Sequence, residues 1–334
     1  MTNIAIVGCG NIGKRHAKWA DKYGNLVAVA DVKISRATLL AKKYKCNAYS
    51  SLTNMLVSQS NIDLVAICTP NGLHVAHTIT ALEFGNNVLC EKPMALTIEG
   101  CEQMIHATEV MNKRLFIVKQ NRFNPPVQTV KELISKGKLG KILNVHLTCA
   151  WNRNDAYYEE SAWRGNINTD GGILYTQFSH FIDLMYYLIG DIDKVQAMAN
   201  NFMHKETTEF PDTIVTAFQF VNGALGTAYF TTNAYNGNME GSLTIFGEKG
   251  TVKIGGKYLN KLDYQSIEGD ILYVPDVIEG CNNYGSYQGS SSKHDEVYKN
   301  VIAVLENKDK IMTTALDGLK TIQIIKKIEE AYKK

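Results

Sequence analysis

The sequence predicts two kinds of fold in one chain: an α/β doubly wound parallel sheet first, then an α+β domain on a mostly antiparallel, open sheet. Up to about residue 118, short apolar runs alternate with helical segments, which is the pattern of a parallel sheet covered by helices. Beyond that point, longer runs alternate polar and apolar residues, as in strands with one face in water. We therefore expect domains at 1–120 and 121–334, with a final helix at 315–332 as a candidate to pack back on the first domain.

The composition narrows the class of protein. The 334 residues are 45% hydrophobic and 20% charged, with a formal net charge of +2, which gives no basis for a nucleic-acid or acidic-membrane partner. No apolar run is long enough to span a membrane, and no signal core precedes the first strand. The seven cysteines form no CxxC pair, and the eight histidines form no HxxxH or HExxH motif. We expect a soluble cytoplasmic protein without a bound metal.

The first strand, residues 3–7, runs directly into a GxGxxG pattern, and a helix is expected from Lys14 to about Tyr23. The three glycines allow a tight turn, a close backbone approach to a pyrophosphate and close packing of the helix on the strand. Unpaired N–H groups at the helix N-terminus then face the phosphates. The candidate cofactor-binding residues of this loop are Gly8, Gly10, Asn11, Ile12 and Gly13.

The second strand, residues 25–30, ends at Asp31, eighteen residues after the last glycine of the pattern. A carboxylate at this position accepts hydrogen bonds from ribose hydroxyls and repels a 2′-phosphate. Strand, glycine loop, helix, strand and acid together predict a dinucleotide site that prefers NAD to NADP. Lys33 and Arg36 weaken that preference, because either cation can meet a 2′-phosphate.

The alternation of strands and helices continues to residue 118. Helices are expected at 37–44, 52–58, 73–84 and 97–111, and strands at 48–49, 64–67, 88–90 and 115–118. Two of these strands end in polar runs, Thr69-Pro70-Asn71 and Glu91-Lys92-Pro93. Because the carboxyl ends of parallel strands meet at one edge of a sheet, both runs should line the same cofactor groove. His74, on the helix between them, is either a structural residue or a cofactor contact, and the structural role is favoured.

Lys92 is the candidate acid–base residue of the first domain. At the end of a buried strand, beside a cationic cofactor ring and partly desolvated, its amine should have a pKa lowered toward a useful range. Pro93 would stiffen the turn that presents the lysine, and Glu91 would orient the lysine or the turn. The alternative is a surface lysine that follows a strand.

From residue 120 the pattern changes to a sheet-rich domain. Strands are expected at 142–151, 194–201, 213–221, 224–231, 241–247 and 251–254. Helices are expected at 127–136, 172–189, 294–306 and 315–332, and a loop rich in Gly, Ser and Tyr at 282–293. The helix at 172–189 carries His180 among apolar neighbours, which by themselves indicate a buried core histidine.

Several motifs, in this order along the chain, together resemble the Gfo/Idh/MocA oxidoreductase family over essentially the whole sequence. They are Gly8–Gly13, Thr69-Pro70-Asn71, Glu91-Lys92-Pro93, Gly171-Gly172, His180-Phe181-Ile182-Asp183 and Gly247-Glu248-Lys249-Gly250-Thr251. The resemblance implies a Rossmann first domain and the oxidation or reduction of a sugar or cyclitol hydroxyl with NAD or NADP. It also implies a homo-oligomer, a dimer or tetramer, formed through the open sheet.

One position departs from the commonest pattern of this family. Many members carry an aspartate four residues before the site histidine, where this sequence has Thr176. The run 174–180 is more similar to the WlbA- and WbpB-type UDP-N-acetylglucosaminuronate 3-dehydrogenases, and the segments 157–158, 163–165 and 287–292 favour the same branch. That branch implies oxidation of the C3 hydroxyl of a UDP-linked N-acetylhexosaminuronic acid in surface-polysaccharide biosynthesis, with 2-oxoglutarate as a recycling oxidant.

The resemblance favours a catalytic role for His180 over a structural role in the core. It implies that His180 and Lys92 together hold the reacting hydroxyl, one removing its proton and the other polarising its oxygen; which of them is the base stays open. Asp183 would pair with a substrate hydroxyl or with a nearby backbone group, and Arg164 would clamp a carboxylate or diphosphate or lie exposed in a loop. The candidate substrate-binding residues are Arg122, Tyr158, Trp163, Arg164, Thr176, Gln177 and Asp183.

Two other functions stay open on the sequence alone. The first is a dehydrogenase of a free sugar or inositol, which a panel of substrates would distinguish. The second is a catalytically silent NAD-binding regulatory protein. Thr176 is the only residue that favours this second function, and the presence of both Lys92 and His180 argues against it.

Overall fold

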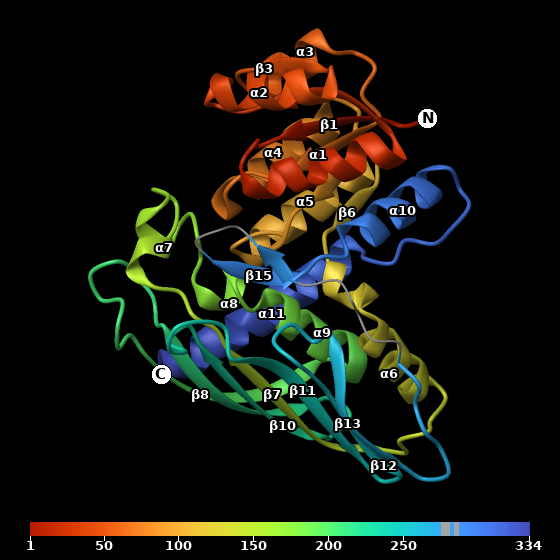
Figure 1. The fold of residues 1–334 in the computed structure, drawn as a ribbon, viewed down its shortest axis with the longest axis vertical. Coiled ribbons are helices and arrows are strands. Elements are labelled where there is room, and N and C mark those ends of the chain that lie inside the picture. Colours follow the sequence, from red (N-terminus) through yellow and green to blue (C-terminus); the bar gives the residue numbers. More distant parts are fainter. Residues whose placement is uncertain (275–280, 284–286) are drawn as a thin grey trace. The chain divides into compact units, whose positions relative to one another are not determined.

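The computed structural model describes residues 1–274, 281–283 and 287–334. The chain forms two compact units, each assembled from two separate stretches of sequence. The first contains Met1–Val118 and His294–Ile322, and the second contains Lys119–Lys293 and Gln323–Lys334. Figure 1 draws the elements of both units, and each unit is described separately below.

The first unit is built on a six-stranded sheet in the order β3-β2-β1-β4-β5-β6. Its strands are β1 (Asn3–Val7), β2 (Asn25–Ala30), β3 (Asn47–Tyr49), β4 (Leu64–Ile67), β5 (Asn87–Cys90) and β6 (Leu115–Ile117). Every neighbouring pair is parallel. All residues of β4 are buried, because helices cover both faces of a parallel sheet and leave no side for water. This sheet confirms the doubly wound fold predicted for this part of the chain.

The helices of the first unit start and stop where the sequence supplies local signals. They are α1 (Asn11–Tyr23), α2 (Ile34–Tyr44), α3 (Leu52–Ser58), η1 (Asn71–Leu73), α4 (His74–Glu83), α5 (Ile98–Met111) and α10 (His294–Leu305). The hydroxyls of Ser51 and Thr97 cap α3 and α5 by accepting the N–H groups of Asn54 and Gly100. In Figure 1, the blue α10 lies with the red and orange elements of this unit, beside α1. A boundary drawn at residue 120 does not anticipate this return of the chain.

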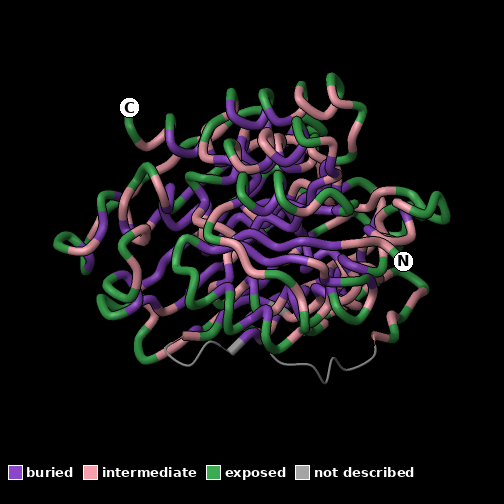
Figure 2. The backbone as a smooth tube through the Cα atoms, turned by 90° about the horizontal axis from the view of Figure 1, so that it is seen from above, coloured by how far each residue is buried: buried purple, intermediate pink, exposed green. Residues whose placement is uncertain are grey.

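The second unit is built on a seven-stranded sheet in the order β13-β12-β11-β7-β10-β9-β8. Its strands are β7 (Ile142–Ala150), β8 (Ile192–Asn200), β9 (Thr213–Phe220), β10 (Leu225–Thr231), β11 (Glu240–Gly247), β12 (Gly250–Gly255) and β13 (Lys261–Ile267). The pairs are antiparallel except β7 with β10. Buried and exposed residues alternate along β9, as its sequence predicts. Figure 2 shows, for the described chain, buried stretches gathered inside and exposed stretches toward the outside.

Short helices cover one face of this second sheet. They are η2 (Gln120–Phe123), α6 (Pro125–Ser135), α7 (Asp155–Glu159), α8 (Ile173–Thr176) and α9 (Ser179–Ile189), and the last helix of the chain is α11 (Ala315–Tyr332). The green α8 and α9 lie over the strands in Figure 1. Aromatic rings fill the layer between helix and sheet: the Trp151 ring centroid lies 5.6 Å from that of Phe178 and 5.3 Å from that of Phe181.

Three local predictions in the second unit were wrong. The single helix expected at 172–189 is two helices, because Gln177 and Phe178 interrupt it and Phe178 packs on Trp151. The loop expected at 282–293 contains a two-stranded pair of β14 (Cys281–Asn283) and β15 (Gln288–Ser291), and residues 284–286 lie outside the described part. The strand β13 was missed because its polar, half-exposed residues carry no apolar alternation.

Among the described residues, no helix combines the length and the low polarity that crossing a bilayer requires. The strands β8, β9 and β10 leave large apolar side chains in water on the sheet face opposite the helices. Met198, Val215 and Leu225 are 75%, 45% and 57% exposed.

Candidate active site

Glycine has two different roles in the loop between β1 and α1. At Gly8, which has φ +94°, a Cβ would lie 2.5 Å from the Cys68 carbonyl oxygen, and at Gly13 it would lie 1.9 Å from the Gly8 carbonyl oxygen. Both positions need glycine because the backbone of the unit itself approaches closely. Gly10 is different, since a Cβ there would meet no atom within 4 Å. The space beside Gly10 suits the close approach of a ligand to the backbone.

The N-terminus of α1 presents backbone donors at this loop. Gly10 is its N-cap and supplies no side-chain acceptor, so the first N–H groups of a thirteen-residue helix are directed toward an incoming anion. Asp31, at the end of β2, accepts the N–H of Cys9 through Oδ2 and that of Lys33 through Oδ1, both at 2.8 Å. Asp31 therefore shapes the glycine loop as well as standing where a ribose is expected. These residues fit a dinucleotide.

The two polar strand ends of this unit are joined by His74. Its Nδ1 lies 2.7 Å from the Pro93 carbonyl oxygen and its Nε2 lies 2.9 Å from the Thr69 carbonyl oxygen. Burial lowers the pKa of His74. The imidazole of His74 thus contacts the main chain of both loops, and the structural role favoured by the sequence stays a prediction. The neighbouring His77 contacts the Thr69 hydroxyl at 3.0 Å, and Asn71 is buried at the start of η1.

Glu91, which follows β5 and precedes Lys92, lies in a buried cluster that the sequence did not reveal. Its Oε1 is 2.8 Å from His16 Nε2 and 3.3 Å from His294 Nε2. The Tyr298 hydroxyl is 2.9 Å from His16 Nδ1, and the backbone N–H of Lys92 donates to Oε2 at 3.1 Å. His16 comes from α1, whereas His294 and Tyr298 come from α10, so only the fold brings them to one carboxylate.

These contacts form one consistent chain of donors and acceptors around Glu91. The Tyr298 hydroxyl donates to His16 Nδ1 and the His16 Nε2–H donates to Glu91 Oε1, while His294 Nε2 lies 3.3 Å from the same oxygen. Burial would raise the pKa of Glu91, but the hydrogen bonds from His16 and His294 hold it well below its usual range. Burial lowers the pKa of His294. The result is a buried carboxylate anion in contact with two imidazoles.

Two histidines and a carboxylate are also a common metal-binding set. The facing atoms of His16, Glu91 and His294 all lie within 4.8 Å of one another, although no local spacing in the sequence indicated such a group. In this structure those atoms are engaged in the hydrogen bonds and ion pairs described above.

In the second unit, His180 sits at the start of α9, buried to 3% exposure. The side-chain nitrogen of Gln120, in η2, lies 3.1 Å from His180 Nε2 and 2.9 Å from the Ser290 hydroxyl on β15. In this amide orientation Gln120 donates to Nε2, which therefore carries a lone pair and leaves the ring proton on Nδ1. Gln120 was not predicted, because an amide at the start of the second unit carries no signal of its own.

Asp183, one turn after His180, is paired with two cations. Arg122 donates to it through Nε and Nη2, each at 2.8 Å, and Lys119 Nζ lies 3.2 Å from Oδ1. All three side chains are about 2% exposed. Burial would raise the pKa of Asp183, but the charges of Arg122 and Lys119 hold it at about 2. The sequence had weighed a substrate hydroxyl against a backbone group, and the partners in this unit are two side chains that tie η2 to α9.

Thr176 lies on α8 and donates its hydroxyl to the carboxylate of Asp170. The other Asp170 oxygen accepts the backbone N–H of Gly165 at 3.0 Å. Asp170 is fully buried, and burial raises its pKa to about 6. The position where many relatives of the resembled family carry an acid thus holds a hydroxyl with a buried acid beside it. This acid was missed because it precedes Thr176 by six residues, outside the motif.

A cluster of arginines and tyrosines lies between α7 and the strand β15. The Arg164 guanidinium is 4.1 Å from the Tyr157 ring centroid, and its Nη2 donates to the Tyr287 hydroxyl at 3.2 Å. Arg153 lies 5.1 Å from both of these rings. Gln177 donates to the Tyr157 hydroxyl at 3.1 Å. Two buried or half-buried cations beside tyrosine rings that meet edge-on form a surface suited to an anionic or planar group.

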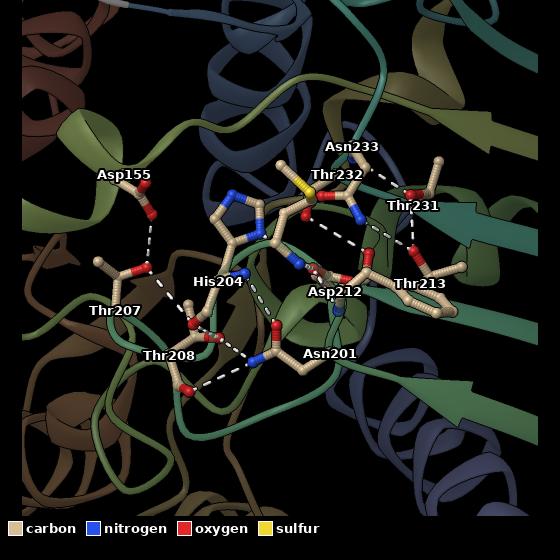
Figure 3. Close-up of polar contacts among 12 residues, drawn as sticks. Asp155, Asn201, His204, Thr207, Thr208, Asp212, Thr213, Thr231, Thr232 and Asn233 are labelled. Atoms are coloured by element: carbon tan, nitrogen blue, oxygen red, sulfur yellow. Dashed lines mark hydrogen bonds and ion pairs between the residues drawn. The ribbon is translucent and has the colours of Figure 1, made fainter.

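Tyr158 and Trp163 flank this cluster. The Tyr158 ring meets the His204 ring at 5.2 Å, and the Arg164 guanidinium lies 5.6 Å from the Trp163 ring. Figure 3 shows His204 beside Asp212, whose Oδ2 lies 3.2 Å from His204 Nδ1. The same oxygen accepts the Met203 N–H at 2.7 Å. Burial would raise the pKa of Asp212, but these hydrogen bonds keep it far below its usual range.

The loop that carries His204 is also tied to α7. Figure 3 shows the Thr207 hydroxyl bonded to Asp155 at the start of that helix, at 2.9 Å. The Asp212 network therefore fixes the loop between β8 and β9 against the segment that carries Tyr157 and Tyr158. The network therefore holds in place the segment that carries the aromatic cluster.

Comparisons with known proteins agree with this architecture. Residues 2–119 match the family model described as oxidoreductase family, NAD-binding Rossmann fold, and residues 127–253 match the GFO/IDH/MocA C-terminal domain. Levoglucosan dehydrogenase from Pseudarthrobacter phenanthrenivorans is 26% identical over 75% of this chain and 72% of its own length.

Two solved structures are similar over nearly the whole chain. The WlbA dehydrogenase from Bordetella pertussis, in complex with NADH and UDP-GlcNAcA, has a TM-score of 0.87 and 32% identity, covering 99% of this chain and 96% of that one. The WlbA dehydrogenase from Chromobacterium violaceum, with the same two ligands, has a TM-score of 0.90 and 31% identity, covering 99% and 94%.

Proposed function

Because the chain belongs to the Gfo/Idh/MocA family of NAD-binding oxidoreductases, we propose that it oxidises the C3 hydroxyl of a UDP-linked N-acetylhexosaminuronic acid to a 3-keto sugar. The observation that carries this proposal is the similarity to two WlbA dehydrogenases whose structures contain NADH and UDP-GlcNAcA. The product would serve the synthesis of a surface polysaccharide. The reaction class is the dehydrogenation of a secondary alcohol of a sugar.

The bound NAD would accept the hydride from the carbon that carries the reacting hydroxyl. The backbone of Gly8–Gly13 and the N-terminus of α1 would hold its pyrophosphate, and Asp31 would hold the adenosine ribose. The strand-end residues of the first unit would complete the site. These are Thr69, Pro70, Asn71, His74, Glu91 and Lys92.

Lys92 and His180 would be the acid–base pair for the hydroxyl proton. Gln120 occupies the Nε2 lone pair of His180 and leaves the ring proton on Nδ1, which favours His180 as a hydrogen-bond donor. We therefore assign the base to Lys92, whose amine is partly exposed after β5. The Lys92 amine would remove the hydroxyl proton, and the His180 N–H would polarise the hydroxyl oxygen. Both contributions would lower the activation barrier of the oxidation.

The substrate would meet Thr176, Gln177, Tyr158, Trp163 and Arg164 in the second unit. Arg164 stacks on Tyr157 and lies beside Arg153, so the cluster offers positive charge to a uronate carboxylate or a diphosphate. Asp183 binds Arg122 and Lys119 with both of its oxygens. For Arg122 and Asp183 we therefore propose a positioning role that fixes η2 against α9.

Replacement of the proposed base gives the first test. The Lys92→Met variant should lose turnover of UDP-GlcNAcA by about 10²- to 10⁴-fold, the usual contribution of a positioned acid–base group. Its affinity for NADH, measured from the change in NADH fluorescence on binding, should stay within about threefold of the wild-type affinity. Near-normal turnover in this variant would contradict the assignment of Lys92.

A substrate panel gives the second test. UDP-sugars that bind the native state raise the thermal midpoint by mass action, and a true substrate produces NADH absorbance. If NADH stays bound between turnovers, 2-oxoglutarate should reoxidise it. Rapid turnover of a free sugar or of inositol, with none of the nucleotide sugar, would favour a free-sugar dehydrogenase, a function that the similarity to levoglucosan dehydrogenase supports. NAD binding without any hydride transfer would favour the regulatory alternative.

We also propose that the chain forms a homo-oligomer, a dimer or a tetramer. The uncovered face of the second sheet carries exposed apolar residues such as Met198 and Leu225, and burial of such a face against a second copy would remove them from water. Light scattering of the purified protein tests this assignment.

A further inference from the structure

The inference drawn here concerns the buried cluster around Glu91 and rests on the proposed role of Lys92 as a base. Glu91 is 5% exposed, and His16, His294 and Tyr298 are 0–1% exposed. A carboxylate moved out of water at such a site is costly unless it is fully hydrogen-bonded. Here Glu91 accepts the Nε2–H of His16 and the backbone N–H of the next residue, and His294 Nε2 lies 3.3 Å from the same carboxylate.

We propose that His16 and His294 position Lys92 through Glu91, by holding that carboxylate as a buried anion whose second oxygen binds the Lys92 backbone N–H. Oε1 receives both histidines, so Oε2 is directed to the main chain of Lys92 at 3.1 Å. The residue that bears the amine is thereby tied to two helices. Because His16 and His294 act through Glu91, they are positioning residues and not catalytic ones.

The charge of Glu91 matters as well as its shape. An anion one residue away favours the ammonium form of Lys92, whereas a cationic cofactor ring favours the free amine. A base is most effective when its pKa lies near the working pH. The Glu91 carboxylate therefore places a negative charge one residue from the Lys92 amine.

The groups that face Glu91 come from several elements, and a pH study must consider all of them. They are Arg15 and His16 on α1, Cys68 after β4, His74 on α4, Cys90 on β5, and His294 and Tyr298 on α10. Burial raises the pKa of the Cys68 and Cys90 thiols and of the Tyr298 hydroxyl. These three groups therefore stay protonated at neutral pH, and the charge near Lys92 is set mainly by Glu91.

The decisive experiment replaces the Glu91 carboxylate with a neutral group of nearly the same shape. In Glu91→Gln, both imidazoles can accept the amide N–H groups if their ring protons move to Nδ1, and the Tyr298 hydroxyl can then accept from His16. The network reverses without losing its contacts. The pKa of Lys92 is read in the protein without substrate, from the rate of its acetylation by trace acetic anhydride against pH, followed by mass spectrometry.

We expect the titration midpoint of Lys92 in Glu91→Gln to fall by about one pH unit. The acid limb of the pH profile of kcat/KM should move in the same direction, and kcat on the plateau should fall, because the amine is a weaker base. A midpoint equal to that of the wild type would overturn the proposal. Since acetylation needs no sugar substrate, this result stands even if UDP-GlcNAcA is not turned over.

A second pair of variants tests the donors. His294→Leu removes an N–H group from Glu91 and should lower kcat about tenfold with little change in KM, whereas His294→Gln returns a donor and should restore most of kcat. The matched control is His106→Leu, which changes an exposed histidine on α5 of the same unit. Equal loss of kcat in both His294 variants would show a packing role only and would contradict the proposal. If His294→Leu does not fold, the Glu91→Gln titration decides alone.

Discussion

Glu91 in the first unit and Asp183 in the second are both buried acids close in sequence to a proposed acid–base residue, but they are stabilised differently. Glu91 contacts two imidazoles and accepts a backbone N–H. Asp183 is held by the guanidinium of Arg122 and the ammonium of Lys119. The partners of Glu91 named here include no lysine or arginine, whereas those of Asp183 are one of each.

The partners of these two carboxylates show how each unit stabilises a buried negative charge. Hydrogen bonds stabilise the anion at Glu91, one residue from Lys92. Two cations face the anion at Asp183, and the guanidinium fork of Arg122 also ties η2 to α9. Loss of a neutral donor and loss of a cation should therefore have costs of different size, which mutations can compare directly.

The largest expected effect is at Arg122. Arg122→Leu removes both hydrogen bonds of a bidentate pair and leaves Asp183 with Lys119 at 3.2 Å. Breaking a buried pair in this way should lower the free energy of unfolding by about 3–5 kcal/mol. Urea unfolding monitored by circular dichroism measures the change.

The matched control for Arg122 is an exposed ion pair in the same unit. Lys136 and Glu132 form an i,i+4 pair on α6 with side chains more than 60% exposed. Lys136→Gln should leave the urea midpoint unchanged, because water already screens such a pair. Equal midpoints for Arg122→Leu and the wild type would show that the pairing of Arg122 with Asp183 is not what stabilises this region.

Asp170 sharpens the comparison, because its named donors are a hydroxyl and a backbone N–H rather than cations. Burial raises its pKa from the ordinary 3.8 to about 6. Between these values the folded protein binds more protons than the unfolded chain. The stability supplied by the protonated form is therefore complete below pH 3.8 and is lost as the pH rises through about 6, by up to about 3 kcal/mol.

In wild-type protein the free energy of unfolding should therefore decrease between pH 4 and 7, and Asp170→Asn should abolish this decrease. Asp183, with its pKa held at about 2, has the opposite sign and stabilises above pH 3.8. Urea unfolding at a series of pH values measures the slope, and Asp21→Asn on an exposed site of α1 is the control. A slope that persists in Asp170→Asn would assign the pH dependence to another group.

The sequence predicted the first unit better than the second, and the reason is physical. In the first unit the chemistry follows from local order: a strand such as β5 ends, and Glu91-Lys92-Pro93 comes next at the sheet edge. Apolar runs and glycine spacing carry that information. The parallel sheet, the glycine loop and the NAD preference of the family were accordingly within reach of the sequence.

The partners of the site residues were out of reach because they come from distant segments. His16 and Glu91 are 75 residues apart, and Gln120 is 170 residues from Ser290. Neither pair has a spacing that a local pattern can show. The break between α8 and α9 depends on the packing of Phe178 against Trp151, which is a tertiary contact that overrides helical periodicity.

Tyr298→Phe gives the smallest expected effect and completes the comparison. It removes the hydroxyl that donates to His16 Nδ1 at 2.9 Å but keeps the ring, which meets the His16 ring edge-on at 5.5 Å. A buried acceptor left without its donor costs about 1–3 kcal/mol, less than the loss of a buried cation. Urea unfolding measures it, with the exposed Tyr235→Phe as the control. A cost as large as that of Arg122→Leu would mean that the network around Glu91 is as sensitive to the loss of one donor as the network around Asp183.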